Sequence, residues 1–379
     1  MRNAIVVPSY ISQSLATLIC FEGAMKKIRV LIVDDSALIR EIFKEILSAD
    51  ESIDVVGTAV DPIDAREKIK QLNPDVLTLD IEMPKMDGIS FLEKIMSLRP
   101  MPVVMASSLT QKGAEMTIRA LELGAFDTIA KPAHNQTRET LAVLGEELIS
   151  KVKAAAIANV RRQKIDSGQH HPLSFNPSSN AQNSLIAIGA STGGVEALRD
   201  VLINLPKNTP PVVIVQHMPA QFTPSFAARL ESLCTINVKE AANHDRLSPG
   251  HAYLAPGGRH LQIKKIGQDF VCKIDDGEKV SGHKPSVDVL FNSVASAAGA
   301  KAVGVIMTGM GRDGADGLLE MRNNGAYTIG QNAASCVVYG MPQAAAKLHA
   351  VTLEVPLSNI AKTILQHFEN KISGGRHDS

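Results

Sequence analysis

Short apolar runs alternate with stretches of helical periodicity, and this alternation fills two separate blocks of the chain. Strand–helix units repeated at this spacing build a parallel sheet with helices on both faces. The first block therefore predicts a doubly wound, flavodoxin-like α/β domain. Its strand candidates are Ile28–Val33, Ile53–Ala59, Val76–Leu79, Val103–Ala106 and Phe126–Ala130.

The second block begins at Ser184 and repeats the same pattern. Its segment Asn237–Val280 carries glycine, proline and alternating apolar residues, which predicts short strands and hairpins inserted into the sheet. We expect a second doubly wound, Rossmann-like α/β domain with a β-hairpin insertion. Its strand candidates are Leu185–Ile188, Val212–Val215, Val303–Met307 and Tyr327–Ile329.

The length of 379 residues exceeds what one core normally supports, so two domains are expected. We expect residues 26–160 to form the first domain and residues 183–379 the second. Residues 161–182 are rich in charged residues, serine, glycine, histidine and proline, as is typical of a flexible, solvated linker. Residues 1–25 are too short and too broken for a membrane span and predict a poorly ordered extension.

The composition argues against several classes of partner. Lys+Arg and Asp+Glu balance at 39 each, aromatic residues make up 4%, and tryptophan is absent. A balanced charge gives no attraction to nucleic acid or to an anionic membrane, and few aromatics leave no stacking platform for single strands. The four cysteines are scattered without a C-x-x-C pair, which favours reduced thiols in a cytoplasmic protein. We also expect that the protein is not inserted in a membrane.

Polar residues follow the strands of the first block where functional groups gather in such sheets. Asp34 and Asp35 follow the first strand, Asp80 ends the third, Ser107 ends the fourth and Lys131 ends the fifth. Three carboxylates on one rim repel each other unless a cation neutralises them, and Mg²⁺ prefers an open, oxygen-rich site. A nearby hydroxyl and ammonium would bind phosphoryl oxygens. The rim predicts an aspartate that accepts a phosphoryl group.

These residues stand in motifs that resemble a response-regulator receiver domain over about residues 28–157. The motifs are Leu31–Ser36, Leu79–Gly88, Ser107 and Lys131-Pro132. The resemblance implies that a sensor histidine kinase phosphorylates Asp80. It also implies that Asp35, Asp80 and the Glu82 carbonyl, beside Asp34, hold Mg²⁺, and that Ser107 and Lys131 sense the phosphoryl group.

The second block opens on an apolar run that ends in Gly189-Ala190-Ser191-Thr192-Gly193-Gly194. A glycine-flanked serine after a strand fits a nucleophile elbow or a phosphate-binding loop. Ser191, His217 and Asp313 each follow a strand candidate, so they share one rim. A serine nucleophile needs a base, and the base needs an acid that orients it. These three residues therefore predict a hydrolase triad.

Two alternatives remain open at this point. Gly309–Gly314 is a G-x-G-x-x-G sequence after an apolar run, a pattern typical of dinucleotide binding, although Gly330–Asn332 offers no acidic residue for a ribose. A phosphorylation-controlled nucleotide-binding module is therefore the second hypothesis. Among the other histidines, His283 is the strongest rival to His217 as the base, or a contact for substrate.

The second block as a whole resembles the catalytic domain of chemotaxis protein-glutamate methylesterases. The resemblance rests, in chain order, on Ile188–Gly194, Gln216–Pro219, Pro285–Phe291, Thr308–Gly314 and Ala334–Pro342. It implies that the matching Ser191, His217 and Asp313 form the triad. It also implies substrates that are glutamyl methyl esters, and in many members selected glutamines, on the cytoplasmic helices of methyl-accepting chemotaxis receptors.

For the reaction we expect no cofactor in the catalytic domain. Backbone N–H groups would bind the oxyanion, with Met310 as a candidate donor, and Thr192 would help to position His217. The first domain is expected to cover the triad rim and to uncover it once Asp80 is phosphorylated.

Overall fold

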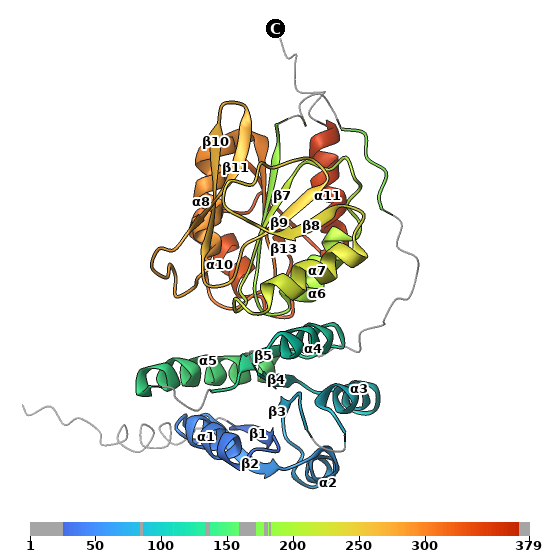
Figure 1. The fold of residues 1–379 in the computed structure, drawn as a ribbon, viewed down its shortest axis with the longest axis vertical. Helices are drawn as coiled ribbons and strands as arrows, with labels where there is room; N and C mark the ends of the chain where they lie inside the picture. The colour runs from blue at the N-terminus through green and yellow to red at the C-terminus, as the bar shows by residue number, and fades with distance from the viewer. Residues whose placement is uncertain are drawn as a thin grey trace, which may run out of the picture.

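The computed structural model describes residues 26–83, 86–108, 110–132, 137–158, 172–177, 181 and 183–370, and the predicted extension 1–25 lies outside these residues. Two α/β domains are stacked on each other, with α4 and α5 of the first domain facing the second (Figure 1). Within the described residues, none of the helices combines the length and the apolar content needed to cross a bilayer.

The first domain contains a five-stranded parallel sheet in the order β2-β1-β3-β4-β5. This is the flavodoxin-like order, so the predicted fold is confirmed. Helices α1 and α5 cover one face, and α2, α3 and α4 cover the other. The elements are β1 (Ile28–Val33), α1 (Ala37–Ser48), β2 (Ile53–Ala59), α2 (Pro62–Leu72), β3 (Val76–Asp80), α3 (Gly88–Leu98), β4 (Val103–Ser107), α4 (Gln111–Glu122), β5 (Asp127–Ala130) and α5 (Arg138–Ile157).

The second domain contains a seven-stranded sheet, all parallel, in the order β14-β13-β12-β6-β7-β9-β8. Along β6, Ile186 and Ile188 face the layer with α6 and α11, while Leu185 and Ala187 face the layer with α8 and α9. Burial on both faces explains why the strand reads as a continuous apolar run.

The elements of the second domain include one antiparallel hairpin, β10–β11, beside the main sheet. They are β6 (Leu185–Ala190), α6 (Gly194–Leu202), β7 (Val212–Gln216), α7 (Thr223–Leu233), β8 (Asn237–Glu240), β9 (His251–Leu254), β10 (His260–Ile266), β11 (Asp269–Asp275), α8 (Val287–Ala298), the 3₁₀ turn Gly299–Lys301, β12 (Ala302–Ile306), α9 (Ala315–Asn323), β13 (Tyr327–Gln331), α10 (Met341–Lys347), β14 (Leu353–Val355) and α11 (Leu357–Asn370).

The predicted hairpin insertion is therefore present, but it is smaller than Asn237–Val280. The first part of that segment supplies β8 and β9, which extend the main sheet in parallel next to β7. Each of these strands has four residues. Periodicity over four residues cannot distinguish an edge strand of a sheet from an arm of a hairpin, and only the pairing decides.

Part of the predicted linker is anchored on the second domain. The Phe175 side chain is 5% exposed and belongs to the core cluster that contains α6. The Leu173 N–H donates to the Asn204 carbonyl at 3.0 Å, and the Asn208 side chain donates to the Phe175 carbonyl at 2.9 Å. Residues 172–177 are thus part of the second domain rather than solvated linker, which moves its start upstream of residue 183.

The two domains meet through apolar contacts and side-chain bonds. Met310, Val337 and Val338 of the second domain pack against the cluster on α1 and α5 of the first. The Arg229 guanidinium on α7 donates to both carboxylate oxygens of Glu122 on α4, at 2.8 and 3.1 Å. A partly exposed ion pair of this kind contributes little free energy, so we attribute most of the stability of the contact to the apolar packing.

The anchored segment predicts a stability difference between two fragments. A fragment of residues 172–379 should melt at a higher temperature than one of residues 183–379, because removing the buried Phe175 ring costs about 3–5 kcal/mol. For a domain of about 200 residues that corresponds to roughly 6–20 °C. Differential scanning calorimetry measures it. Phe175→Ala in the longer fragment should remove most of this difference in melting temperature, whereas Asn176→Ala, at an exposed position, should keep it. Equal melting temperatures of the two unmodified fragments would contradict the anchoring.

Candidate active site

The three residues predicted as a triad come from three neighbouring strands. Ser191 follows β6, His217 follows β7, and Asp313 lies in the turn after β12. In the sheet β6 lies between β12 and β7. The chain leaves β6 toward β7 on one side and later returns to β12 on the other, so Ser191 stands at a topological switch point, where sheets of this kind open a crevice.

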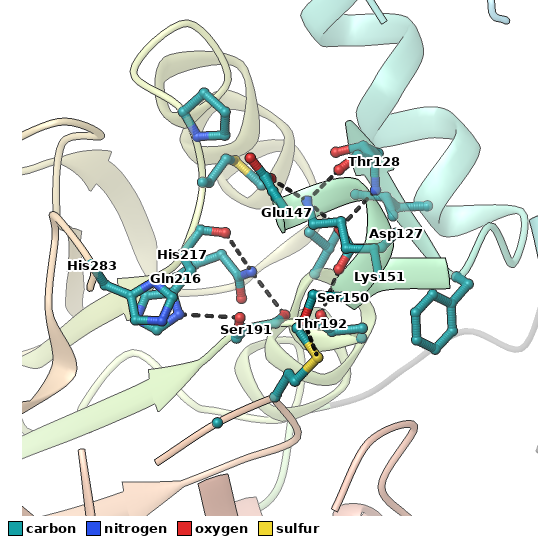
Figure 2. A pocket seen from close by; sticks show the side chains of 18 of the residues that line it. Asp127, Thr128, Glu147, Ser150, Lys151, Ser191, Thr192, Gln216, His217 and His283 are labelled. Carbon is teal, nitrogen blue, oxygen red and sulfur yellow. Dashed lines mark hydrogen bonds and ion pairs between the residues drawn. The ribbon is translucent and has the colours of Figure 1, made fainter. Parts of the chain in front are cut away.

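The side chains form a continuous chain of hydrogen bonds. His217 Nδ1 lies 3.1 Å from Ser191 Oγ, and His217 Nε2 lies 2.8 Å from Asp313 Oδ2 (Figure 2 shows the Ser191 bond). A carboxylate accepts only, so Nε2 carries the proton and Nδ1 is left as the acceptor for the serine hydroxyl. This tautomer is the one that a general base requires.

The Asp313 carboxylate is held at the N-terminus of α8. The backbone N–H groups of Val287 and Asp288 donate to it at 2.7 and 3.1 Å, and the Ser286 hydroxyl donates at 2.8 Å. Burial alone would raise the pKa of Asp313, which is 1% exposed, but the bonds from His217 and the two N–H groups outweigh it and hold that pKa well below its usual range. The acid therefore stays charged, which keeps His217 oriented.

Sequence reasoning did not assign Ser286 a role. Its hydroxyl also caps α8 through the Val289 N–H, and its own N–H donates to His260 Nδ1 at 3.1 Å. The sequence signal was available, because a serine just before an apolar helical run is typical of a helix cap. What it could not reveal is that the cap also binds a carboxylate 27 residues away in sequence.

The glycine-rich stretch 309–314 packs against Ser191 at its first glycine. A Cβ on Gly309 would lie 2.8 Å from the Ser191 Cβ, so only glycine lets this turn pass so close. The Gly309 N–H already donates to the Val338 carbonyl, and its carbonyl accepts from Met341. Both backbone groups of Gly309 are therefore in use and the residue is packed against Ser191, so the first glycine of the stretch is not available to a pyrophosphate.

A cavity of about 700 Å³ lies between the domains and includes Ser191 and His217 in its wall (Figure 2). The first domain contributes β5 and α5 to the lining, including Asp127 and Lys151. The Thr192 hydroxyl donates to the Asp127 carboxylate. This corrects the prediction for Thr192, whose hydroxyl is bonded to the first domain rather than to His217.

Met310 also faces the first domain. Its sulfur lies 3.5 Å from the Ser150 hydroxyl on α5. Close by, Lys151 is paired with Asp127 at 3.3 Å and with Glu147 at 2.7 Å. Burial lowers the pKa of the Lys151 ammonium, but these two carboxylates more than compensate and raise it. No sequence signal links these residues to the triad, because the contact is between domains.

The predicted phosphoacceptor rim is also assembled. Lys131 Nζ lies 2.8 Å from Asp34 and 2.7 Å from Asp80, and both carboxylates are 1% exposed. Burial, and then repulsion from Asp34, raises the pKa of Asp80 to about 6. One ammonium therefore balances the two buried carboxylates incompletely, and a further cation fits the charge of this rim.

The remaining predicted residues lie around this pair. Asp35 is exposed, and its carboxylate lies within 4.8 Å of those of Asp34 and Asp80. The Glu82 N–H donates to Asp80 Oδ1 at 3.1 Å, while Asp80 Oδ2 is buried and accepts no hydrogen bond within the described residues. Oxygens at this spacing with an unused acceptor fit Mg²⁺. Ser107 is buried and accepts a bond from Thr117 at 2.7 Å.

Known proteins resemble the chain along nearly all of its length. The profile of the response regulator receiver domain matches residues 30–142, and that of the CheB methylesterase matches residues 186–364. The protein-glutamate methylesterase/protein-glutamine glutaminase of Nitrosomonas europaea is 52% identical over 353 residues, which cover 90% of this chain and 96% of that protein.

A second relative matches the chain over a similar length, and one solved structure matches its second domain. The protein-glutamate methylesterase/protein-glutamine glutaminase of Escherichia coli (strain K12) is 53% identical over 357 residues and covers 93% of this chain and 99% of that protein. The solved catalytic domain of Thermotoga maritima CheB methylesterase is 36% identical, with a TM-score of 0.48 over 48% of this chain and 98% of that domain. From the two relatives, each more than half identical, it follows that the chain belongs to the CheB methylesterase family, in its form with an N-terminal response-regulator receiver domain.

Proposed function

We propose that this protein is a phosphorylation-activated serine hydrolase. Its substrates are glutamyl methyl esters, and also glutamine side chains, on the cytoplasmic helices of methyl-accepting chemotaxis receptors, and its reaction gives sensory adaptation. The observation that carries the proposal is the hydrogen-bonded chain Ser191–His217–Asp313 at one rim. The names of the relatives support the two substrate classes.

In the first half of the reaction, Ser191 Oγ attacks the side-chain carbonyl carbon while His217 Nδ1 takes the hydroxyl proton. The resulting oxyanion needs N–H donors in place. We assign Met310 N–H as one donor, because Gly309 holds that turn against Ser191 and the Met310 N–H has no partner among the described residues. Collapse of the tetrahedral intermediate breaks the C–O or C–N bond, and Nδ1 returns the proton to methanol or ammonia.

In the second half, water attacks the glutamyl-serine ester and His217 Nδ1 takes a proton from it. The bond to Ser191 Oγ then breaks, the proton returns to the serine, and a glutamate carboxylate remains on the receptor. Asp313 keeps its charge throughout and stabilises the imidazolium that forms twice in the cycle. No cofactor is needed for these steps.

Control comes from the receiver domain. We propose that a sensor histidine kinase phosphorylates Asp80 in the cytoplasm, and that Ser107 and Lys131 sense the phosphoryl group. Asp34, Asp35, Asp80 and the Glu82 carbonyl would hold Mg²⁺, whose charge would neutralise the incoming phosphoryl oxygens. The receiver covers the triad rim, since β5 and α5 form one wall of the cavity at Ser191. Phosphorylation then shifts the protein toward an open arrangement.

Removing the nucleophile separates the two activities. Ser191→Ala should lower methanol release from a methylated receptor by at least about 10³-fold, while Asp80 is still phosphorylated by acetyl phosphate. Gas chromatography of methanol and radiolabelled phosphodonor measure the two activities. The exposed Ser232→Ala on α7 is the control and should retain both. Hydrolysis that survives in Ser191→Ala would contradict the assignment of the nucleophile.

Removing the receiver tests the covering role. The fragment 172–379 should release methanol about tenfold or more faster than the unphosphorylated full chain, which corresponds to about 1.4 kcal/mol of inhibitory docking. Acetyl phosphate should raise the rate of the full chain and have no effect on the Asp80→Asn variant. A fragment that is no faster than the full chain would exclude steric inhibition.

The domain contact also predicts a pH dependence. Glu196 on α6 lines the cavity, and its Oε1 is buried without a partner in the described part of the chain. Burial raises the pKa of Glu196 to about 8, because it outweighs the lowering effect of nearby Arg199, and the charges of Asp200 and Glu122 add smaller increases. The docked state favours the protonated carboxyl of Glu196. Its contribution to docking is complete below about pH 4.5, where the carboxyl is protonated in both states, and it is lost progressively as the pH rises to about 8.

The rate of the unphosphorylated full chain, divided by that of the fragment 172–379, should therefore rise from about pH 5 to about pH 8 and level off above that. This ratio cancels the pH dependence of the triad itself. Glu196→Gln stays neutral and should give a flat ratio, whereas Glu45→Gln, an exposed carboxyl on α1, should behave as the wild type. A ratio that rises equally in Glu196→Gln would assign the effect to another group.

A further inference from the structure

The catalytic histidine has a second histidine against its face. The rings of His217 and His283 are stacked, with centroids 3.8 Å apart and an angle of 12° between their planes (in Figure 2 the two rings overlap). The bonds of His217 to Ser191 and Asp313 run through its ring nitrogens, in the ring plane. These two bonds do not prevent the His217 ring from rotating about the line through its two bonded nitrogens. A ring stacked on its face prevents this rotation.

A tight turn delivers His283 to this position. Val280 and His283 exchange backbone hydrogen bonds at 3.1 and 2.9 Å, and the two residues between them, Ser281 and Gly282, have φ values of 52° and 80°. Two successive left-handed residues are typical of a type I′ turn. The conformation thus fixes where the ring of His283 points.

The same turn is tied to the acid of the triad. The Ser281 hydroxyl donates to Asp288 Oδ2 at 3.0 Å, and the Asp288 N–H donates to Asp313 Oδ1 at 3.1 Å. Residues 280–288 therefore act on His217 in two directions. The Asp288 N–H holds Asp313, which binds the edge of the His217 ring, and His283 covers the face of that ring.

His283 is placed poorly for proton transfer to the nucleophile. The hydrogen bond to Ser191 Oγ belongs to His217, and a ring stacked in parallel presents its π face rather than a nitrogen lone pair to its neighbour. Burial and then the nearness of His217 lower the pKa of His283 to about 4, with Asp313 opposing and Lys279 and Lys151 adding to the effect. The ring of His283 is therefore neutral at pH 7.

We propose that His283 is a positioning residue for the hydrolysis, a neutral aromatic plate that fixes the plane of His217 and stabilises its imidazolium through its π face. This inference rests on the proposed function where the receptor is the substrate, but the positioning of His217 can be tested without a receptor. It requires only that Ser191 be activated by His217, which a small reagent can report.

The first test uses the full chain with acetyl phosphate and phenylmethanesulfonyl fluoride. Ser191 Oγ forms a bond to sulfur, fluoride leaves, and His217 takes the serine proton. Mass spectrometry gives the rate of sulfonylation. We expect His283→Ala to lower it about tenfold and His283→Phe, which keeps an aromatic face, to stay within about threefold of the wild type. An unchanged rate in His283→Ala overturns the proposal.

A second measurement separates positioning from proton transfer and from substrate contact. With methylated receptor, His283→Ala should lower kcat and leave KM within about twofold. A raised KM with unchanged kcat assigns His283 to substrate binding. If kcat falls equally in His283→Phe and His283→Ala, and added imidazole restores it in both, His283 takes part in proton transfer. Either result overturns the positioning role.

The controls keep the two proposals apart. Sulfonylation that slows as expected in His283→Ala, without methanol release by the wild type, would contradict the receptor reaction and support the positioning role. Methanol release by the wild type with no change in His283→Ala would do the reverse. Ser281→Ala, which removes the tie to Asp288 and leaves the ring in place, should give a smaller loss than His283→Ala, and a larger loss would place the effect in the loop rather than in the ring.

Discussion

The site depends on one buried negative charge. The Asp313 carboxylate accepts bonds from His217, from the Ser286 hydroxyl and from two N–H groups at the start of α8. An uncompensated carboxylate at this depth would take up a proton, and a protonated acid would no longer select the tautomer of His217. The helix N-terminus supplies the compensation. The position of α8 is therefore a chemical requirement as well as a packing one.

The parallel sheet explains why residues so far apart in sequence meet. Each strand enters from the same side, so the loops that follow β6, β7 and β12 open at one rim. Ser191 and Asp313 are 122 positions apart, yet their strands pair directly, with Ile188 opposite Val305. The receiver repeats this arrangement with other chemistry, and its rim collects Asp34, Asp80 and Lys131.

Much of this could be predicted from local sequence. Buried strands are continuous apolar runs, and polar residues directly after them mark the rim, which is why Ser191, His217 and Asp80 stood out. The rest depends on contacts that periodicity does not encode. The pairing of β9 with β7, the burial of Phe175, the bond between Thr192 and Asp127 and the ring of His283 over His217 are each set by tertiary packing between distant segments.

The shortness of β5 has a mechanical consequence. This strand is Asp127–Ala130, and within the described residues it lies at the edge of its sheet and pairs only with β4. Lys131, directly after it, is paired with Asp80, the proposed phosphoacceptor, and Asp127, its first residue, accepts the bond from Thr192, which follows Ser191, the proposed nucleophile. Four extended residues span about 13 Å. A single short strand, paired on one side, thus connects the rim at Asp80 with the residues beside Ser191. A shift of Lys131 along the strand axis would move Asp127 and its partner Thr192 without any helix having to unfold.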